Sequence, residues 1–328
     1  MPDEELAAGV EAVLGSPTRV EPLVAADSLS GARLERWVVG VARYVVKELD
    51  PRRDWIMRVT GDTRLRPVQV WDGGVLAALP GCVDHAVVGC VRSGPRAAVV
   101  LRDVGPWLVP AGGAVIPLAQ HLAFIDHMAA LHAAFWGWRD QLGLMPLAGR
   151  YRELAPDPHR EDVAAGHANP IAAALLDGWA RLPEAAPRAA ALVERLLDDP
   201  APLVAAFDGQ PRTLVHGDWK LGNLGTLEDG RTVLLDWAVP GEAPACVDLA
   251  WYLAVNCDRM PQSKEAAIAE YRRRLEAHGV DTSGWWDAQL ALALLGGLVQ
   301  LGWAKTAAGG PELAWWEERA LETRRYLA

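Results

Sequence analysis

Four polar residues with the chemistry of group transfer lie close together near the middle of the C-terminal half of the chain. Residues 214–223 read LVHGDWKLGN and contain Asp218, Lys220 and Asn223, and the run VLLDWA at 233–238 adds Asp236. A carboxylate such as Asp218 can accept the proton of an attacking hydroxyl group. Asn223 and Asp236 offer the hard oxygen ligands that Mg²⁺ prefers. The order and spacing of these residues indicate phosphoryl transfer from a magnesium nucleotide.

The residues around this set predict a tight loop followed by a strand. Gly217 and Gly222 permit backbone angles that other residues avoid, so the loop between them can turn sharply twice. Residues 232–235, TVLL, are β-branched and aliphatic and follow the turn sequence EDG. We therefore expect a buried strand that ends at Asp236 and holds its carboxylate rigidly.

The sequence HGDWKLGN followed by LLDWA resembles the catalytic loop and metal-binding motif of the aminoglycoside phosphotransferase and choline kinase-like family, which shares its fold with the protein kinases. The resemblance implies an α+β, two-lobed protein-kinase-like fold. A small N-terminal lobe with an antiparallel sheet is expected at 1–103. A larger, mainly helical C-terminal lobe is expected at 104–328.

The resemblance also implies a role for each residue of the motif. Asp218 is the catalytic base, and Lys220 steadies the moving phosphoryl group. Asn223 and Asp236 bind Mg²⁺, and ATP or GTP is the co-substrate.

An upstream lysine completes the expected nucleotide site. The segment 37–49, WVVGVARYVVKEL, is rich in valine and aromatic residues with one glycine break, which predicts two short strands or one bent strand. Lys47 in this segment is similar to the phosphate-anchoring lysine of the family. In the preceding sequence DSLSGAR, Ser28, Ser30 and Gly31 could offer hydroxyl and N–H groups to phosphate, and an ordinary turn is the alternative.

The acidic partner of Lys47 departs from the family pattern. In the family a glutamate on the next helix holds the lysine. The segment 66–79, RPVQVWDGGVLAAL, predicts that helix, with Pro67 in its first turn, but it contains no glutamate. Asp72 and Asp62 are the two remaining candidates. The departure leaves a nucleotide-binding pseudokinase scaffold as the alternative to an active kinase.

The segment 97–103, AAVVLRD, predicts a buried strand that runs into the linker between the lobes. Backbone groups around Leu101 and Asp103 could then hydrogen-bond to the base of the nucleotide. Residues 118–136 carry apolar residues at helical spacing and predict a long, half-buried helix beneath the catalytic loop.

Four residues around the loop have supporting or acceptor-binding interpretations. Asp248 begins an apolar helical segment, which it could cap. The family has a similar aspartate that braces the catalytic loop, so Asp248 is assigned structural support, together with His216 of the motif. Trp219 and Trp251 are candidates for the wall of the acceptor pocket, because aromatic faces suit sugars and cations. Core packing is the alternative for both.

Composition limits the partners and the location. The 328 residues carry a formal net charge of -10, which disfavours nucleic acid and suits a cationic acceptor. We expect no signal peptide and no apolar run long enough to span a bilayer, hence a cytoplasmic protein with no membrane partner. The four cysteines form no CxxC pattern, so neither a zinc site nor a disulfide framework is expected.

The expected function is transfer of the γ-phosphate of ATP or GTP to a hydroxyl of a sugar-, aminoglycoside- or nucleoside-type acceptor. Inactivation of an antibiotic, or self-resistance to one, is the role that the resemblance suggests. A protein acceptor is disfavoured, because the short stretch between Asp236 and Cys246 leaves little room for a peptide-binding segment.

Overall fold

The computed structural model describes residues 2–24 and 30–327. It contains two compact units. Unit 1 comprises Met1–Gly112 and Leu221–Ala238, and unit 2 comprises Gly113–Lys220 and Val239–Ala328. This division differs from the expected one at residue 103, because the segment that carries Asn223 and Asp236 packs with the N-terminal part of the chain. The lobe boundary at 103 stays a prediction.

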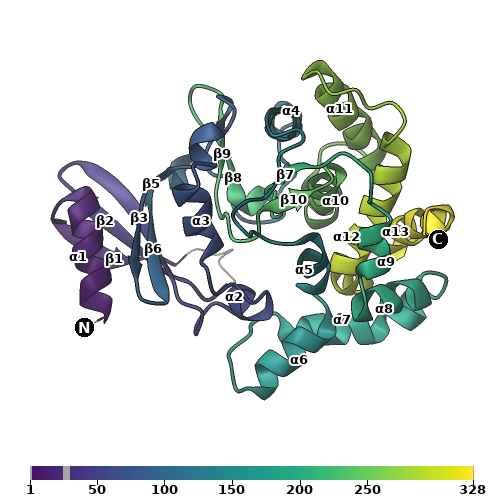
Figure 1. Cartoon of the computed structure of the whole chain (residues 1–328), viewed down its shortest axis with the longest axis horizontal. Coiled ribbons are helices and arrows are strands. Elements are labelled where there is room, and N and C mark those ends of the chain that lie inside the picture. Colours follow the sequence, from purple (N-terminus) through teal and green to yellow (C-terminus); the bar gives the residue numbers. More distant parts are fainter. Residues whose placement is uncertain (1, 25–29, 328) are drawn as a thin grey trace. The chain divides into compact units, whose positions relative to one another are not determined.

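An antiparallel sheet of five strands is the framework of unit 1, in the order β1-β2-β3-β6-β5 (Figure 1). The strands are β1 (Arg19–Pro22), β2 (Arg33–Val39), β3 (Ala42–Leu49), β5 (Val87–Ser93) and β6 (Arg96–Arg102). The glycine break expected within 37–49 is the turn between β2 and β3, where Gly40 has a φ of 60°. Strand β6 confirms the strand expected at 97–103.

A smaller sheet in unit 1 contains the strand that follows Asn223 and the strand that precedes Asp236. It consists of β4 (Val83–Asp84), β9 (Thr232–Leu234) and β8 (Leu224–Thr226), with β8 antiparallel to β9. Leu224 pairs with Leu234 in this hairpin. The residue before β8 and the residues after β9 therefore lie at the same end of the hairpin, which is where Asn223 and Asp236 fall.

Unit 1 also contains three helices and three 3₁₀ turns among its described residues. They are α1 (Pro2–Leu14), α2 (Trp55–Val59), α3 (Arg66–Asp72) and the 3₁₀ turns η1 (Leu76–Ala78), η2 (Gly105–Trp107) and η3 (Leu221–Asn223). Pro67 lies in the first turn of α3, as expected. The helix predicted over 66–79 is shorter than expected, because Gly73 and Gly74 end α3, and Gly74 has a φ of 72°.

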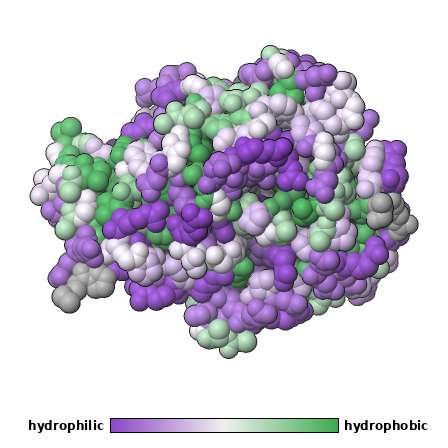
Figure 2. Space-filling view, in the orientation of Figure 1, coloured by the Kyte–Doolittle hydropathy of each residue, from purple (hydrophilic) through white to green (hydrophobic). Residues whose placement is uncertain are grey.

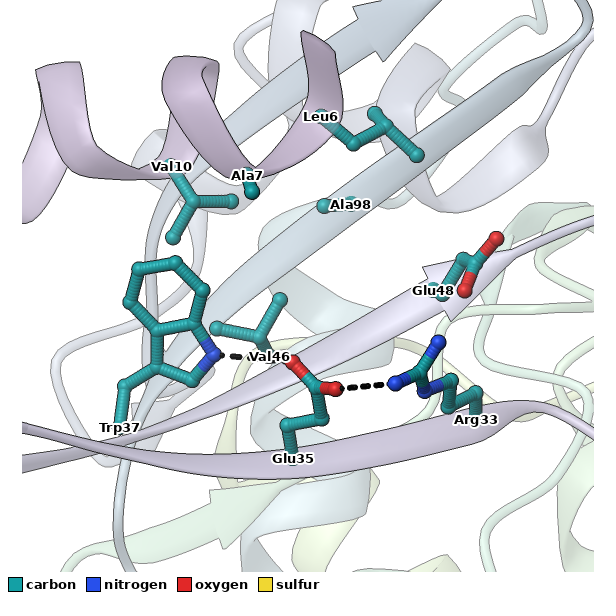
Figure 3. Close-up of a pocket in the computed structure, with 9 residues that line it drawn as sticks. All are labelled: Leu6, Ala7, Val10, Arg33, Glu35, Trp37, Val46, Glu48 and Ala98. Atoms are coloured by element: carbon teal, nitrogen blue, oxygen red, sulfur yellow. Dashed lines mark hydrogen bonds and ion pairs between the residues drawn. The ribbon is translucent and has the colours of Figure 1, made fainter. Parts of the chain in front are cut away.

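One face of the large sheet packs against α1. The contacts are apolar and join Leu6 and Val10 of α1 to Trp37, Val46 and Val100 of the strands. A cavity of about 180 Å³ lies between this helix and the sheet, and Figure 3 shows the residues that line it. Three of its polar groups pair with one another, since the indole of Trp37 and the guanidinium of Arg33 both contact Glu35. Glu48, which also lines the cavity, pairs with Arg96.

Because side chains alternate across a strand, the neighbours of these residues point to the opposite face of the sheet. Trp37 and Val46 face α1, whereas Arg36, Val45 and Lys47 face the other way and line a separate cavity. The nucleotide-site candidates are therefore on the face that α1 leaves open.

Unit 2 is mainly helical. Its helices are α4 (Leu118–Ala134), α5 (Leu147–Arg152), α6 (Pro156–Ala164), α7 (Ala172–Ala185), α8 (Ala190–Asp198), α9 (Ala201–Ala205), α10 (Cys246–Val255), α11 (Lys264–Ala277), α12 (Trp286–Ala308) and α13 (Gly310–Glu322), with the 3₁₀ turns η4 (Cys257–Arg259) and η5 (Thr323–Arg325). Strand β7 (Thr213–Val215) leads into the loop His216–Asp218, here called the HGD loop, and pairs with β10 (Gly241–Ala243) in a two-stranded ribbon. Helix α4 confirms the long helix expected at 118–136.

Helix α12 is the central helix of unit 2 and packs against α7, α10 and α13. We expected no apolar run long enough to span a bilayer, and this expectation is wrong. By length and composition alone α12 could do so, because it has 23 residues and a mean hydropathy of 1.3 in its most apolar window. Within the structure, 78% of that window is buried. Such burial is typical of the core helix of a globular unit.

Hydrophilic residues cover much of the face seen in Figure 2, with hydrophobic residues scattered among them. This distribution agrees with the 42 acidic and 32 basic residues of the chain. None of the four cysteines forms a disulfide, and of the four Cys246 is the one that is fully buried.

Candidate active site

A cavity of about 290 Å³ in unit 1 gathers five of the residues that the sequence singled out. Lys47, Leu101, Asp103, Asn223 and Asp236 all line it. They come from β3, from the end of β6 and from the residues that flank the open end of the β8–β9 hairpin. Residues far apart in the sequence thus meet at one concave surface, where basic, acidic and amide groups face apolar side chains.

Lys47 and Asp236 form an ion pair in this cavity. The Nζ of Lys47 lies 2.7 Å from Oδ1 of Asp236, and both side chains are largely shielded from solvent. Asp236 has a φ of 64°, in the left-handed region that residues other than glycine rarely adopt. Strained backbone of this kind persists where the surroundings fix it, and it is concentrated at functional sites.

The prediction that Asp62 or Asp72 pairs with Lys47 is wrong. Asp62 instead stabilises the start of α3, because its carboxylate accepts hydrogen bonds from the backbone N–H groups of Leu65 and Arg66 at 2.9 and 3.0 Å. Asp72 is exposed and lies 3.4 Å from the guanidinium of Arg92. Neither carboxylate is engaged with the lysine.

Asp54 is a further acidic residue whose charge interacts with that of Lys47, and it was not among the candidates predicted from the sequence. It is the N-cap of α2, where Oδ1 accepts the N–H of Met57 at 3.2 Å, and its side chain is buried. Burial raises the pKa of Asp54, whereas the nearby charge of Lys47 lowers it and that of Asp236 raises it. The charge state of Asp54 is therefore coupled to the charges of Lys47 and Asp236. An aspartate directly before the apolar run WIM was a usable helix-start signal.

Asn223 is held beside Asp236 by the β8–β9 hairpin. Its backbone carbonyl accepts the N–H of Leu235 at 2.9 Å, and its side chain is mostly buried. An amide oxygen and a carboxylate thus face one cavity. Among the described residues no group of three or more His, Cys, Asp or Glu side chains could hold a metal ion, so a cation here would depend on these two ligands together with phosphate and water.

Aliphatic side chains form much of the remaining lining of the cavity, namely Leu23, Leu34, Val45, Leu101, Val104, Leu108 and Leu235. Asp103 also lines the cavity, and its Oδ2 accepts a hydrogen bond from Nε of Arg36 at 2.9 Å. The N–H of Asp103 already donates to the carbonyl of Arg43 at 3.0 Å, so this group is not open to a ligand.

The serine loop is only partly described. Ser28 lies outside the described residues. Ser30 is buried, and its hydroxyl accepts the N–H of Ala32 at 3.3 Å. Gly31 has a φ of 87°, and a Cβ there would come within 2.7 Å of the carbonyl of Arg53. Neither Ser30 nor Gly31 lines the cavity that contains Lys47.

Asp218 and Lys220 belong to unit 2. Their side chains form an ion pair, with Nζ of Lys220 2.9 Å from Oδ2 of Asp218. The other carboxylate oxygen, Oδ1, accepts a hydrogen bond from the indole N–H of Trp251 at 3.0 Å. The two parts of the motif are joined directly by the peptide bond between Lys220 and Leu221.

A buried carboxylate, Asp248, fixes the backbone of the HGD loop. It accepts the N–H of His216 at 2.7 Å and that of Gly217 at 2.8 Å, and Nε2 of His132 lies 3.2 Å away. Burial alone would raise the pKa of Asp248, but the hydrogen bond from His132 and the contacts with His216 hold it below its ordinary value. Asp248 does not cap α10, contrary to expectation, because its oxygens are turned to the loop.

His216 is fully buried, and its Nδ1 accepts the N–H of Asp218 at 3.2 Å. Gly217 has a φ of 81°, and a Cβ there would lie 2.3 Å from the carbonyl oxygen of Val239. The loop therefore has this shape because Asp248 and His216 bind its N–H groups and because glycine alone fits at 217.

The two tryptophans differ from the acceptor-pocket interpretation. Trp219 is fully buried, with its ring edge against His216, so it cannot present a face to an acceptor. Trp251 is only 6% exposed, and its ring is covered by the guanidinium of Arg150 at 4.1 Å. Sequence adjacency to Asp218 did not reveal that Trp219 points into the core.

Comparisons with known proteins give the family and the fold. Residues 94–285 match the model of the phosphotransferase enzyme family. Among curated protein sequences none matches the chain significantly.

Three solved structures share the fold over almost the whole chain at low identity. A microcompartment-associated aminopropanol kinase has a TM-score of 0.57 and 14% identity, covering 97% of this chain and 94% of that one. An amicoumacin kinase in complex with AMP-PNP, Ca²⁺ and Ami has a TM-score of 0.56 and 12% identity, covering 98% and 94%. The choline kinase LicA from Streptococcus pneumoniae has a TM-score of 0.53 and 12% identity, covering 98% and 99%. The expected α+β kinase-like fold is confirmed.

Proposed function

The chain belongs to the phosphotransferase enzyme family, and from this premise we propose that it transfers the γ-phosphate of ATP or GTP to a hydroxyl group of a small molecule. The observation that carries the proposal is the meeting of Lys47, Asn223 and Asp236 at one cavity of unit 1. These are the groups that nucleotide phosphates and a divalent cation need, and they come from distant parts of the sequence.

In unit 1 the roles follow from the chemistry of the side chains that line the cavity. Its aliphatic side chains enclose the base of the nucleotide, with Leu101 and Val45 against the faces of the base. The N–H of Asp103 is occupied, so we assign the hydrogen bond to the base to the backbone that follows, at Val104, which also lines the cavity. Lys47 binds the phosphates. Asp54 is the carboxylate that orients this lysine in place of the absent glutamate.

The residues present fit Mg²⁺. Asn223 and Asp236 are oxygen ligands of the preferred kind, and two ligands from the protein are the usual number where phosphate supplies others. When bound, the ion neutralises charge on the phosphates and on the departing nucleoside diphosphate. The amicoumacin kinase was solved with AMP-PNP and Ca²⁺, which supports the use of a nucleotide and a divalent cation in this fold.

In unit 2, Asp218 is the base. It accepts the proton of the acceptor hydroxyl as the hydroxyl oxygen forms a bond to the γ-phosphorus and the bond between that phosphorus and the β,γ-bridging oxygen breaks. Lys220, in ion-pair contact with Asp218, steadies the transferred group. His216 and Asp248 keep the loop in shape.

A cationic, hydroxylated small molecule is the acceptor class that we propose. Two of the structural relatives are named as kinases of aminopropanol and of choline, and each compound combines a hydroxyl group with a positively charged nitrogen. The formal net charge of -10 favours such a molecule over an anion. Aminoglycosides, other amino sugars and nucleoside antibiotics belong to this class or lie close to it, so we propose antibiotic inactivation or self-resistance in the cytoplasm, with no nucleic acid or membrane as partner.

Two measurements test the proposal. Thermal-shift titrations with Mg·ATP and Mg·GTP first establish binding and the preferred base. A screen of aminoglycosides, amino alcohols, sugars and nucleosides with γ-³²P-labelled nucleotide then identifies labelled products. Labelled product from any acceptor supports the kinase. Stabilisation by nucleotide without turnover would favour the pseudokinase scaffold, and no stabilisation by either nucleotide would refute both functions.

A further inference from the structure

The carboxylate of Asp218 is held at both oxygens by groups of different kinds. Oδ2 faces the flexible ammonium of Lys220, whereas Oδ1 accepts the indole N–H of Trp251 at 3.0 Å. Trp251 belongs to α10 and is 6% exposed, so its ring cannot rotate without disturbing the core. The indole is therefore the rigid one of the two contacts.

Arg150 fixes this indole from the other side. Its guanidinium carbon lies 4.1 Å from the centre of the Trp251 ring, a cation–π contact that is strong when the cation is desolvated. Arg150 is 3% exposed, and Gln300 of α12 donates to its backbone carbonyl at 3.1 Å. Helix α5 thus presents a fixed cation to the face of the indole.

The same guanidinium also binds the HGD loop directly. One terminal nitrogen of Arg150 donates to the carbonyl of Gly217, the residue before Asp218. The other is paired with the carboxylate of Glu153, which is also buried. One arginine therefore contacts both the ring that holds Asp218 and the backbone that leads into it.

A buried ion pair is an expensive way to stabilise a fold, because the desolvation of both charges offsets much of their attraction. Apolar side chains at 150 and 153 would fill the space at lower cost. The contacts instead converge on one functional carboxylate, which is the arrangement that a preorganised site requires.

We propose that Trp251 and Arg150 are positioning residues for phosphoryl transfer, which fix the rotation of the Asp218 carboxylate toward the acceptor hydroxyl. This inference rests on the proposed function. Asp218 accepts the proton, and Trp251 orients the Asp218 carboxylate through Oδ1. Arg150 fixes the positions of the Trp251 indole and of the Gly217 carbonyl.

Trp251→Phe tests the role of the indole N–H, since phenylalanine keeps an aromatic ring beneath Arg150 but has no donor. Trp316→Phe is a matched control in the same unit. Trp316 is also buried, donates its indole N–H to a carboxylate, Oε1 of Glu312, at 2.8 Å, and lies near a cation, Lys305, at 5.9 Å. The two substitutions remove the same kind of contact, one at Asp218 and one remote from the HGD loop.

We expect Trp251→Phe to lower kcat by about tenfold or more with the nucleotide KM changed less than about twofold, since an ill-oriented base slows the chemical step and not nucleotide binding. Trp316→Phe should lose comparable thermal stability and keep kcat. The assay uses the acceptor from the labelling screen, or Mg·ATP hydrolysis as the basal reaction. Equal kcat values for the two variants would overturn the inference and leave the kinase assignment intact.

A second measurement does not depend on turnover. The indole N–H signal of Trp251 in a ¹H–¹⁵N spectrum is the one that Trp251→Phe removes. In Asp218→Asn this signal should move toward the values of weaker hydrogen bonds, because a charged acceptor is replaced by a neutral one. An unmoved signal would contradict the contact. A wild-type protein that turns over no acceptor and hydrolyses neither nucleotide would refute the proposed function, and the positioning role with it.

Discussion

Nζ of Lys47 lies 2.7 Å from Oδ1 of Asp236, so the lysine that should bind phosphate and the carboxylate that should bind the cation form one ion pair across 189 residues of sequence. Strand β3 supplies one group and the end of the β8–β9 hairpin supplies the other. If a cation and a phosphate entered this cavity, the cation would bind Asp236 and the phosphate would bind Lys47. Both partners are therefore tested best by substitutions that keep their shape.

Asp236→Asn should abolish Mg²⁺-dependent turnover and leave the fold intact. Asparagine tolerates the left-handed φ of 64° at this position and can still accept a hydrogen bond from Lys47, so mainly the negative charge is lost. We expect kcat to fall by roughly 10²–10³-fold or more, measured over a Mg²⁺ titration. Asp229→Asn, at an exposed turn of the same unit, is the control. Normal turnover of Asp236→Asn would show that the metal assignment is wrong.

Asp54→Ser should weaken nucleotide binding without destabilising α2. Serine is a good N-cap and can keep the bond to the N–H of Met57, but it has no charge to orient Lys47. We expect the nucleotide KM to rise by about tenfold, roughly 1.4 kcal/mol, with an almost unchanged Tm. Asp54→Ala, which also loses the cap, should add about 1 kcal/mol of destabilisation. Unchanged KM values in both variants would exclude Asp54 as the partner of Lys47.

The contrast between Asp54 and Asp236 explains what the sequence could and could not predict. Asp236 lies in a contiguous motif that also specifies the strand before it, so its neighbours in the sequence are its neighbours in space. The charge of Asp54 acts on Lys47 because the short helix α2 follows soon after β3, whereas the resemblance pointed to a later helix. A helix of five residues is too short for its apolar periodicity to be recognised.

The direction in which a side chain points is the second property that the sequence predicts only in part. The alternation along β3 fixes which face Lys47 shares with Val45, and this follows from the period of a strand. Trp219 lies in a loop, where no period applies, and its burial depends on packing against His216. The contact between Trp251 and Asp218 likewise joins two elements whose approach the sequence does not encode locally.

Glu312 should make the stability of unit 2 depend on acid pH. Burial alone would raise the pKa of its carboxyl, but the hydrogen bond from Lys264, the charge of Lys305 and the indole N–H of Trp316 together lower it from 4.5 to about 2. A depressed pKa stabilises the folded state fully above the unfolded value, and the stabilisation is lost as pH falls from about 4.5 to about 2.

Glu312→Gln removes this contribution and leaves the buried Lys305 with less compensation. We expect its Tm to lie several degrees below that of the wild type at pH 6, at roughly 2–4 °C per kcal/mol, and the two values to converge as pH approaches 2. Thermal scans by circular dichroism across this range measure the difference. Glu318→Gln, exposed on the same helix, is the control. A constant Tm difference from pH 6 to pH 2 would contradict the depressed pKa.

Gly217→Ala should damage the HGD loop far more than its left-handed backbone alone would predict. Gly217 and Gly230 have similar φ values, 81° and 86°, so alanine meets a comparable conformational cost of about 1–2 kcal/mol at each. Only at 217 does the new Cβ meet the protein, 2.3 Å from the carbonyl oxygen of Val239, whereas it would point into open space at 230. The backbone at 217 has to move, and this motion breaks the bonds of its N–H to Asp248 and of its carbonyl to Arg150.

We therefore expect Gly217→Ala to cost at least about 2 kcal/mol more than Gly230→Ala in urea unfolding, and to reduce kcat because Asp218 moves with the loop. Gly230→Ala should keep kcat, since its turn lies on the far side of the β8–β9 hairpin from Asn223 and Asp236. Equal unfolding free energies for the two variants would mean that the loop relaxes around a Cβ at 217 without cost. In that case the bonds from Asp248 and Arg150, and not the glycine, would be what sets the position of the catalytic carboxylate.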